Sequence, residues 1–336
     1  MLSKSAFLAS AAALVAGAAI LSTSATAQNA STAYSGDTIS IEGFIGRVEI
    51  RTGNSSQIQV AVSNPGDLVE TPQVASRGNV VAIDGGQSMR NLNCSNRNGT
   101  MRIGRGGWGF GNRHDINEYP TLTITAPASV ALELRSSAFL GEAGNLGSLD
   151  LSMSSCGRFD GADVTGDAFV RISGSGDVYL DEIGGRSTVD INGSGDVELA
   201  SVARDARIDI SGSGDVTAAD VGGDVAIDIN GSGDVRLGEI AGLSVRVSGS
   251  GDIEAQRMNG AFDARINGSG DIEVHGGRAE PFEASISGSG DIRFDGTAVN
   301  VTVNESGSGD VHVEDVEGSI NWRRNGRTVL HVGTAD

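Results

Sequence analysis

The stretch TVDINGSGDVELASV (residues 188–202) decides the fold of this chain, because its central five residues recur. SGSGD or NGSGD appears eight times, and successive copies lie 18 to 20 residues apart. The copies end at Asp177, Asp196, Asp215, Asp234, Asp252, Asp271, Asp291 and Asp310. A period of this length is typical of repeat proteins, in which each unit buries its apolar face against its neighbours. The sequence therefore predicts a stack of like units.

Apolar and polar residues alternate on both sides of each motif. Val189 and Ile191 precede the glycines of one copy, and Val197 and Leu199 follow them. Such alternation predicts β-strands with one buried face. The glycines between the strands predict tight corners with positive φ. The chain is thus expected to be all-β, a single-stranded parallel β-helix (β-solenoid) with rungs of about 19 residues.

The repeat weakens toward both ends of the predicted solenoid, which we place at residues 131–318. Two rungs without the motif are expected to come first, with Arg158 one rung and Phe139 two rungs before Asp177 at the same position. Residues 319–336, which include Trp322, are predicted to be a C-terminal cap, because a terminal rung must cover the core.

Residues 1–27 are predicted to be a secretory signal peptide. They combine a basic Lys4, an apolar run from Ala6 to Leu21, and small residues before Gln28. No second apolar run is long enough to cross a membrane. We expect the mature chain to be exported, to the periplasm, the cell surface or the extracellular medium.

Residues 28–130 are expected to form an irregular β-rich head. Within it, residues 91–118 are rich in Gly, Asn and Arg without periodicity, and we predict a surface loop there. Cys94 and Cys156 are an even number of cysteines in an exported chain, which favours a disulfide between them. The alternative is a buried free thiol at Cys156 with Cys94 exposed.

Charge divides the chain into an acidic rod and a near-neutral head. Residues 159–320 hold 31 acidic and 10 basic residues, whereas the whole chain has a net charge of −19. So acidic a rod argues against binding to nucleic acid or anionic lipid, because phosphate contacts need a basic surface. The predicted loop is locally basic and is either a solvated loop or a partner-binding loop. Its candidate residues are Arg97, Arg102, Arg105, Trp108, Phe110 and Arg113.

The eight motif aspartates should form a column along one corner, spaced about 4.8 Å apart. Carboxylates this close repel unless they are hydrogen-bonded or bridged by a cation. One hypothesis is a Ca²⁺-binding edge, since Ca²⁺ prefers oxygen ligands. The favoured hypothesis is structural: each Asp accepts hydrogen bonds from corner amides, and no metal or other cofactor is required.

Catalysis has little support in the sequence. The four histidines are scattered, and GxSxG, HExxH, CxxC and P-loop sequences are absent. The predicted rungs also lack the irregular loops that form a cleft in polysaccharide-acting β-helix enzymes. We therefore predict no catalytic residues and treat such an enzyme as the least favoured alternative.

The strand-rich head, the segment TLTITAP (121–127) and the repeated SGSGDV together resemble the DUF2807 family over roughly residues 40–318. That family is described as "putative auto-transporter adhesin, head GIN domain". The resemblance implies a parallel β-helical fold and an adhesive role at the envelope. It supplies no catalytic residues.

These observations favour an exported, non-enzymatic β-solenoid that acts as an adhesin or structural module of the cell envelope. Its expected partner is an envelope polysaccharide or protein, and self-association is a further expectation. A Ca²⁺-stabilised binding rod that uses the Asp column is the alternative.

Overall fold

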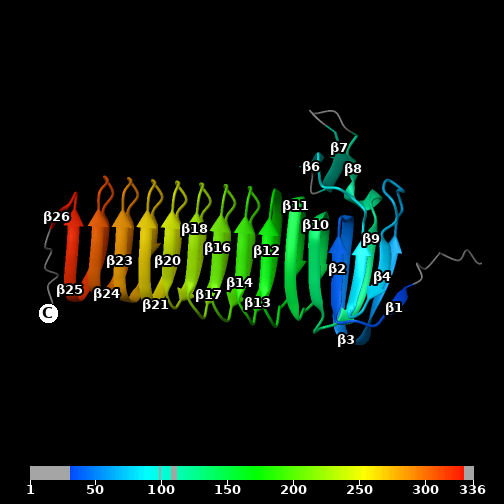
Figure 1. Cartoon of the computed structure of the whole chain (residues 1–336), viewed down its shortest axis with the longest axis horizontal. Coiled ribbons are helices and arrows are strands. Elements are labelled where there is room, and N and C mark those ends of the chain that lie inside the picture. The colour runs from blue at the N-terminus through cyan, green and yellow to red at the C-terminus, as the bar shows by residue number, and fades with distance from the viewer. Residues whose placement is uncertain (1–30, 98–99, 107–111, 329–336) are drawn as a thin grey trace, which may run out of the picture.

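The chain forms one elongated stack of β-coils, with its N-terminal coils at one end and its C-terminal strands at the other (Figure 1). The computed structural model describes residues 31–97, 100–106 and 112–328. The predicted signal peptide and the last eight residues of the predicted cap lie outside the described residues. Within them, no helix has the length and apolar composition that crossing a bilayer requires.

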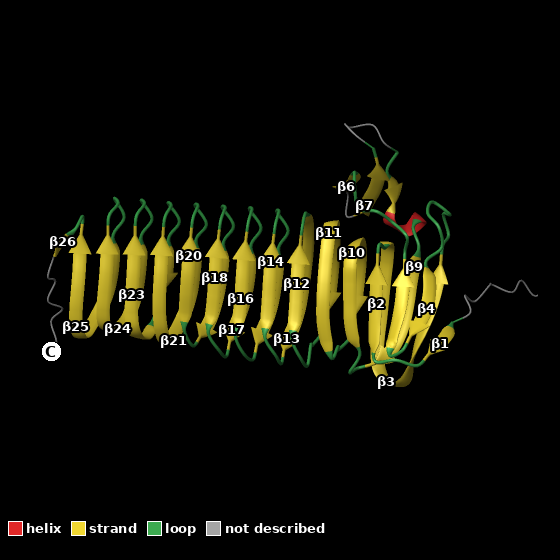
Figure 2. Cartoon of the chain, viewed as in Figure 1, coloured by secondary structure: helices red, strands yellow, loops and turns green. Residues whose placement is uncertain are grey.

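The strands of the stack are β10 (Ala131–Ala143), β11 (Ser148–Gly161), β12 (Ala168–Ile172), β13 (Ser175–Ile183), β14 (Ser187–Ile191), β15 (Val197–Val202), β16 (Ala206–Ile210), β17 (Val216–Val221), β18 (Val225–Ile229), β19 (Val235–Ile240), β20 (Leu243–Val247), β21 (Ile253–Ile266), β22 (Ile272–Val274), β23 (Gly277–Ile286), β24 (Ile292–Glu305), β25 (Val311–Arg324) and β26 (Arg327–Thr328). The coils from β12 to β19 contain two strands each, joined by two corners, whereas β10, β11, β21, β24 and β25 each continue through a corner. The SGSGD corners lie in a row along one long edge (Figure 2).

Strands of successive coils pair in parallel and in register, which confirms the predicted β-solenoid. Ile191 of β14 lies opposite Ile210 of β16, which lies opposite Ile229 of β18, each 19 residues on. Each of these isoleucines is at most 1 % exposed. They belong to one continuous apolar core that runs from β2 to β25. The hydrophobic effect therefore acts on every coil alike, as the sequence periodicity indicates.

The corner glycines are needed for a different reason from the one predicted. None of the glycines in the eight motifs has φ in the left-handed region. Instead, a Cβ built on Gly193 would lie 2.0 Å from the carbonyl oxygen of Gly174 in the preceding coil, and Gly212 stands in the same relation to Gly193. Successive corners stack so closely that any side chain would collide with backbone.

The N-terminal region continues the stack and does not form a separate body. Its elements are β1 (Thr32–Tyr34), β2 (Thr38–Glu42), β3 (Ile45–Ser63), β4 (Gln73–Arg77), β5 (Val80–Asp84) and β9 (Thr121–Pro127). β2 pairs with β5 on one side and with β10 on the other, while the first part of β3 lies between β9 and β10. Along the stack, β5 and β9 therefore lie outside β2 and β3. After β9 the chain passes to the other side of β2 and β3, where β10 begins the regular stack.

The register of the first rung differs by one residue from the prediction. Arg158 does lie opposite Asp177, but it is Leu140, and not Phe139, that lies opposite Arg158. Two register shifts interrupt the pairing of β10 with β11, and Ser136 has φ of 47°. Paired residues of β10 and β11 are 17 apart in sequence before these shifts, as Leu132 and Leu149 are, and 18 apart after them. Phe139 lies in the core, where it is fully buried.

Residues 91–118 are not the loop that we predicted. They form a three-stranded antiparallel sheet of β6 (Leu92–Arg97), β7 (Thr100–Arg105) and β8 (His114–Asp115), followed by the 3₁₀ helix η1 (Ile116–Glu118). The sheet projects sideways from the stack near its N-terminal end (Figure 1). Met101 and Ile103 pack with Ile116 and Tyr119 against residues of the first coils. We call residues 91–118 the head sheet.

Candidate functional site

The motif aspartates form a ladder of hydrogen bonds along the corner edge. The Oδ1 atom of each motif Asp from Asp177 to Asp291 accepts from the backbone N–H of the motif Asp in the next coil. The seven donor–acceptor distances lie between 2.7 and 3.4 Å. The ladder thus runs from Asp177 to Asp310. It differs from the expected Asx-turn, in which a side chain binds an amide of its own corner.

This geometry limits what a cation could find on the ladder. One carboxylate oxygen of each Asp is committed to an amide, and motif positions two coils apart are separated by about 9.6 Å. A single ion could therefore contact carboxylates from two neighbouring coils at most, whereas Ca²⁺ takes six to eight oxygen ligands. At the first coil, burial is the main cause that raises the pKa of the Asp177 carboxyl above its ordinary value.

At Asp310, the last motif aspartate, the ladder meets a set of polar residues. In the coil before it, the amide of Ile292 donates to the carbonyl oxygen of Asp310. One coil further on, the amide of Val311 donates to Oε1 of Glu305 at 3.1 Å. Glu305 is 2 % exposed and lies opposite Ile286 of the preceding coil. Arg324 pairs with both Glu305 and Asp310. Together these groups satisfy the last corner.

The opposite corner carries a second, less regular set of aspartates. Oδ1 of Asp205 accepts from the backbone N–H of Asp224, and Oδ1 of Asp224 accepts from that of Gly242. Nε of Arg186 donates to Oδ2 of Asp205 at 3.1 Å. This hydrogen bond, followed by the one from the Asp224 amide, lowers the pKa of the Asp205 carboxyl. The two corners therefore shift carboxyl pKa values in opposite directions: burial raises that of Asp177, and hydrogen bonds lower that of Asp205.

The basic residues of the head sheet lie on its exposed surface. Arg102 donates to the carbonyl oxygen of Arg113, and Arg105 donates to Oε1 of Gln87. Among the described residues, neither Arg102, Arg105, Arg113 nor Arg90 has a carboxylate within ion-pair distance. Arg97 ends β6, and its side chain lies outside the described residues, as do Trp108 and Phe110. We call Arg102, Arg105 and Arg113, together with Arg90 at the residue before the sheet, the head arginines.

A disulfide joins the head sheet to the stack. Cys94 lies on β6 opposite Ile103 of β7, and Cys156 lies on β11 in the second regular coil. The two residues are bonded through sulfur, with Cα atoms 6.3 Å apart. Tyr119 adds a second link, since its hydroxyl donates to the carbonyl oxygen of Ile103 at 3.1 Å. The head arginines are therefore held on an anchored sheet.

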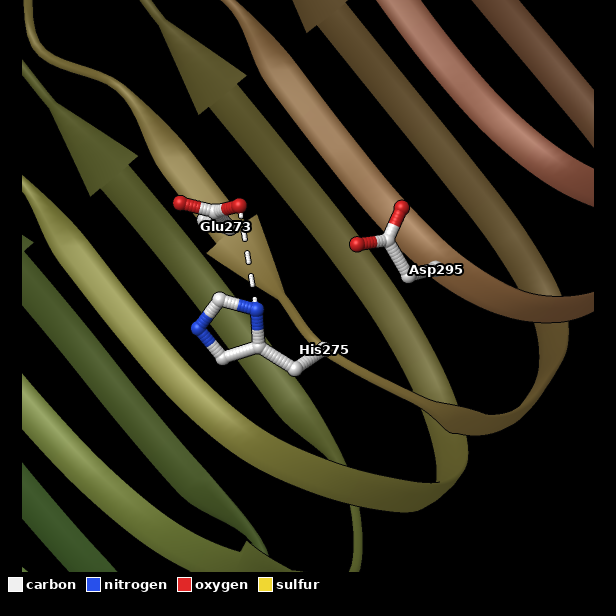
Figure 3. A group of neighbouring side chains, drawn as sticks. All are labelled: Glu273, His275 and Asp295. Atoms are coloured by element: carbon white, nitrogen blue, oxygen red, sulfur yellow. Dashed lines mark ion pairs between the residues drawn. The ribbon is translucent and has the colours of Figure 1, made fainter.

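One further cluster escaped the sequence reasoning. Glu273, His275 and Asp295 lie on the outer surface of β22, the segment after it, and β24 (Figure 3). The signal was available: residues 273 and 275 alternate outward, and Asp295 follows His275 by one coil of 20 residues, as Asp291 follows Asp271. The scattered order of the histidines in the sequence had hidden this proximity.

Comparison with known proteins identifies a family for this chain. A family model described as "Putative auto-transporter adhesin, head GIN domain" (DUF2807) matches residues 59–256 and 240–321. The chain belongs to the DUF2807 family. No curated protein matches the sequence. Among solved structures, a crystal structure of a "putative adhesin" from Bacteroides fragilis is similar, with 16 % sequence identity and a TM-score of 0.37, over 84 % of this chain and 95 % of that one.

Proposed function

We propose that this DUF2807 protein is an exported, non-enzymatic adhesin-type module of the cell envelope, and that its head sheet binds an anionic envelope polysaccharide. The observation that carries the proposal is the contrast in charge pairing. Rod arginines such as Arg171 and Arg186 pair with Asp190 and Asp205 of the next coil, whereas the head arginines have no carboxylate partner within the described residues. Uncompensated guanidinium groups on a rigid sheet favour a partner with repeated carboxylates or phosphates.

The rod supports this role as a spacer. Its core is continuous, its outer faces are strongly acidic, and its coils carry no long insertions after β11. A rigid acidic rod resists aggregation, because copies of like charge repel one another. Its length also keeps the head sheet away from the other end of the molecule. The family description as an adhesin agrees with a binding module rather than a catalyst.

A binding measurement with matched variants tests the proposal. The double variant Arg102→Gln/Arg105→Gln removes two head arginines. Arg204→Gln/Arg246→Gln removes two exposed rod arginines that also have no carboxylate within ion-pair distance in the described part of the chain. Both variants change the net charge by the same amount. We expect retention on purified anionic envelope polysaccharide to fall about tenfold or more in the head variant alone, and to weaken with salt. An equal loss of retention in both variants, or retention by the rod alone, would contradict the proposal.

Location and catalysis need separate measurements. Cell fractionation with protease accessibility on intact cells tests export, and a protein found in the cytoplasm contradicts it. Turnover on a panel of uronic-acid polymers would contradict the non-enzymatic role. Self-association through a head sheet and the acidic rod of a second copy is tested by sedimentation, where a salt-sensitive oligomer would replace the polysaccharide as the partner.

The alternative function is a Ca²⁺-stabilised rod, which the ladder geometry disfavours because a backbone amide of the next coil already binds Oδ1 of its aspartates. Melting with millimolar Ca²⁺ and with EDTA tests this role. Ligand that binds the native state must raise the midpoint. Since each ion meets carboxylates from two coils at most, we expect an unchanged midpoint.

A further inference from the structure

Near the C-terminal end of the rod, three side chains that can bind metal come together on the outer surface. One ligand atom from each of Glu273, His275 and Asp295 lies within 4.8 Å of the others. Among the described residues, this is the one such group of histidine, cysteine and acidic residues. Glu273 and His275 come from one coil, and Asp295 comes from the next (Figure 3).

A fourth residue orients the imidazole. Nε2 of His275 lies 2.9 Å from Oε1 of Glu254, in the preceding coil. When Nε2–H donates to this carboxylate, Nδ1 carries the lone pair. Nδ1 faces Glu273, at 3.7 Å from its Oε1 (Figure 3). A carboxylate that fixes the tautomer and angle of a histidine in this way is the usual arrangement behind a metal-bound imidazole.

The carboxylates at this point already share a cation. Nε of Arg293 lies 3.6 Å from Oε1 of Glu273, and its Nη2 lies 2.9 Å from Oδ1 of Asp295. The guanidinium therefore occupies the place between the two acidic side chains. Because all these side chains are partly exposed, they can turn without disturbing the core. A compact divalent ion needs ligand atoms about 3.3 Å apart, so small rotations of exposed side chains would bring them into range.

We propose that Glu273, His275 and Asp295 form a binding site for a divalent first-row transition ion such as Zn²⁺, with Glu254 as a positioning residue and Arg293 as a competing cation. Imidazole nitrogen and carboxylate oxygen are ligands of Zn²⁺, and an exposed site leaves a position for water. The presence of a nitrogen ligand favours such an ion over Ca²⁺ or Mg²⁺.

Metal binding here would tie three coils together. Glu254, the Glu273–His275 pair and Asp295 follow one another along the stack, one coil at a time. An ion held by the native arrangement and not by the unfolded chain stabilises the fold by mass action. The site lies close to the C-terminal coil, whose inner residues Val313, Val316 and Ile320 are less buried than their counterparts in the middle of the rod.

Titration of Zn²⁺ into the tag-free mature chain, followed by calorimetry and thermal melting, tests the proposal with three variants. His275→Gln removes the nitrogen ligand. Arg293→Gln removes the competing charge. His114→Gln is the matched control, because His114 also faces a carboxylate, Glu118 at 3.3 Å, but lies on the head sheet.

We expect one Zn²⁺ per chain and a raised melting midpoint in the wild type and in the control. His275→Gln should weaken binding at least about tenfold and abolish the midpoint shift. Arg293→Gln should tighten binding roughly tenfold, because a positive charge next to the ion is lost. Absence of stoichiometric binding in the wild type, binding that survives His275→Gln, or loss of binding in the control variant overturns the assignment.

Discussion

The regular coils and the head sheet are attached to the molecule in contrasting ways. In the coils, backbone meets backbone: the corner of Gly212 rests on that of Gly193, and outward side chains such as Asp215 bind the amides of the next coil. The head sheet rests on a small apolar cluster around Ile103 and on the Cys94–Cys156 bond. Stability is therefore shared among many equivalent contacts in the rod and concentrated in a few contacts at the head.

The disulfide should show the largest effect. Replacing both cysteines by serine, Cys94→Ser/Cys156→Ser, opens a closure over 62 residues of sequence. The chain-entropy relation gives about 4 kcal/mol for a loop of this size. We expect the loss to fall on the head sheet: hydrogen exchange should quicken in β6 and β7 while the protection of β14 to β19 stays unchanged. Equal loss of protection in the rod would contradict the comparison.

The second-largest loss of stability is expected when a methyl group is added at a stacked corner. In Gly212→Ala, the new Cβ would lie 2.0 Å from the carbonyl oxygen of Gly193, and backbone cannot move aside without separating two coils. We expect a loss of about 3 kcal/mol in the free energy of unfolding, at the upper end of overpacking effects. Gly53→Ala is the control, because nothing lies within 4 Å of its Cβ position. Denaturant midpoints check both, and a tolerated Gly212→Ala would contradict the close stacking.

The same contrast explains what the sequence could predict. The 19-residue period placed Ile191, Ile210 and Ile229 in the core, because every coil meets the same local requirement. The head sheet was missed, although Leu92 and Cys94 alternate before Asn98–Gly99 and Met101 and Ile103 alternate after it, which is a hairpin pattern. The route of β2 and β3 between β9 and β10 depends on pairings across the whole N-terminal region, which local patterns do not encode.

The candidate sites also differ in how far the sequence could predict them. The ladder of motif aspartates was predictable from its period, but its bonds to the next coil depend on the closeness of the corners. Glu305 occupies the position that Ile286 takes in the coil before it, so an acidic residue at an apolar position marked the last corner. The Glu273–His275–Asp295 group could have been found only once the register was known.

A ladder variant should have a smaller effect than a corner methyl. Asp215→Ala leaves the amide of Asp234 without its acceptor and should cost about 1 to 2 kcal/mol. Asp215→Asn keeps an oxygen acceptor and removes one of a column of like charges, so it should be close to neutral. Denaturant midpoints separate the two, with Arg102→Ala on the head sheet as a surface reference near zero. If the Asn variant loses as much as the Ala variant, the charge and not the hydrogen bond holds the ladder.

The smallest expected effects concern the pH dependence of stability, which should differ between the two corners. Burial raises the folded-state pKa of Asp177, so its charge costs stability at neutral pH, and this cost disappears as the pH falls through the raised value. The Arg186 hydrogen bond lowers the folded-state pKa of Asp205, so its charge adds stability above the unfolded pKa of about 3.9, and this gain is lost as the pH falls through the lowered value. Asp177→Asn should therefore melt at or slightly above the wild-type midpoint at pH 7, and Asp205→Asn slightly below it. Both differences should shrink toward pH 3 in melts at stepped pH, and differences of the same sign at pH 7 would show that the two corners hold their carboxylates alike.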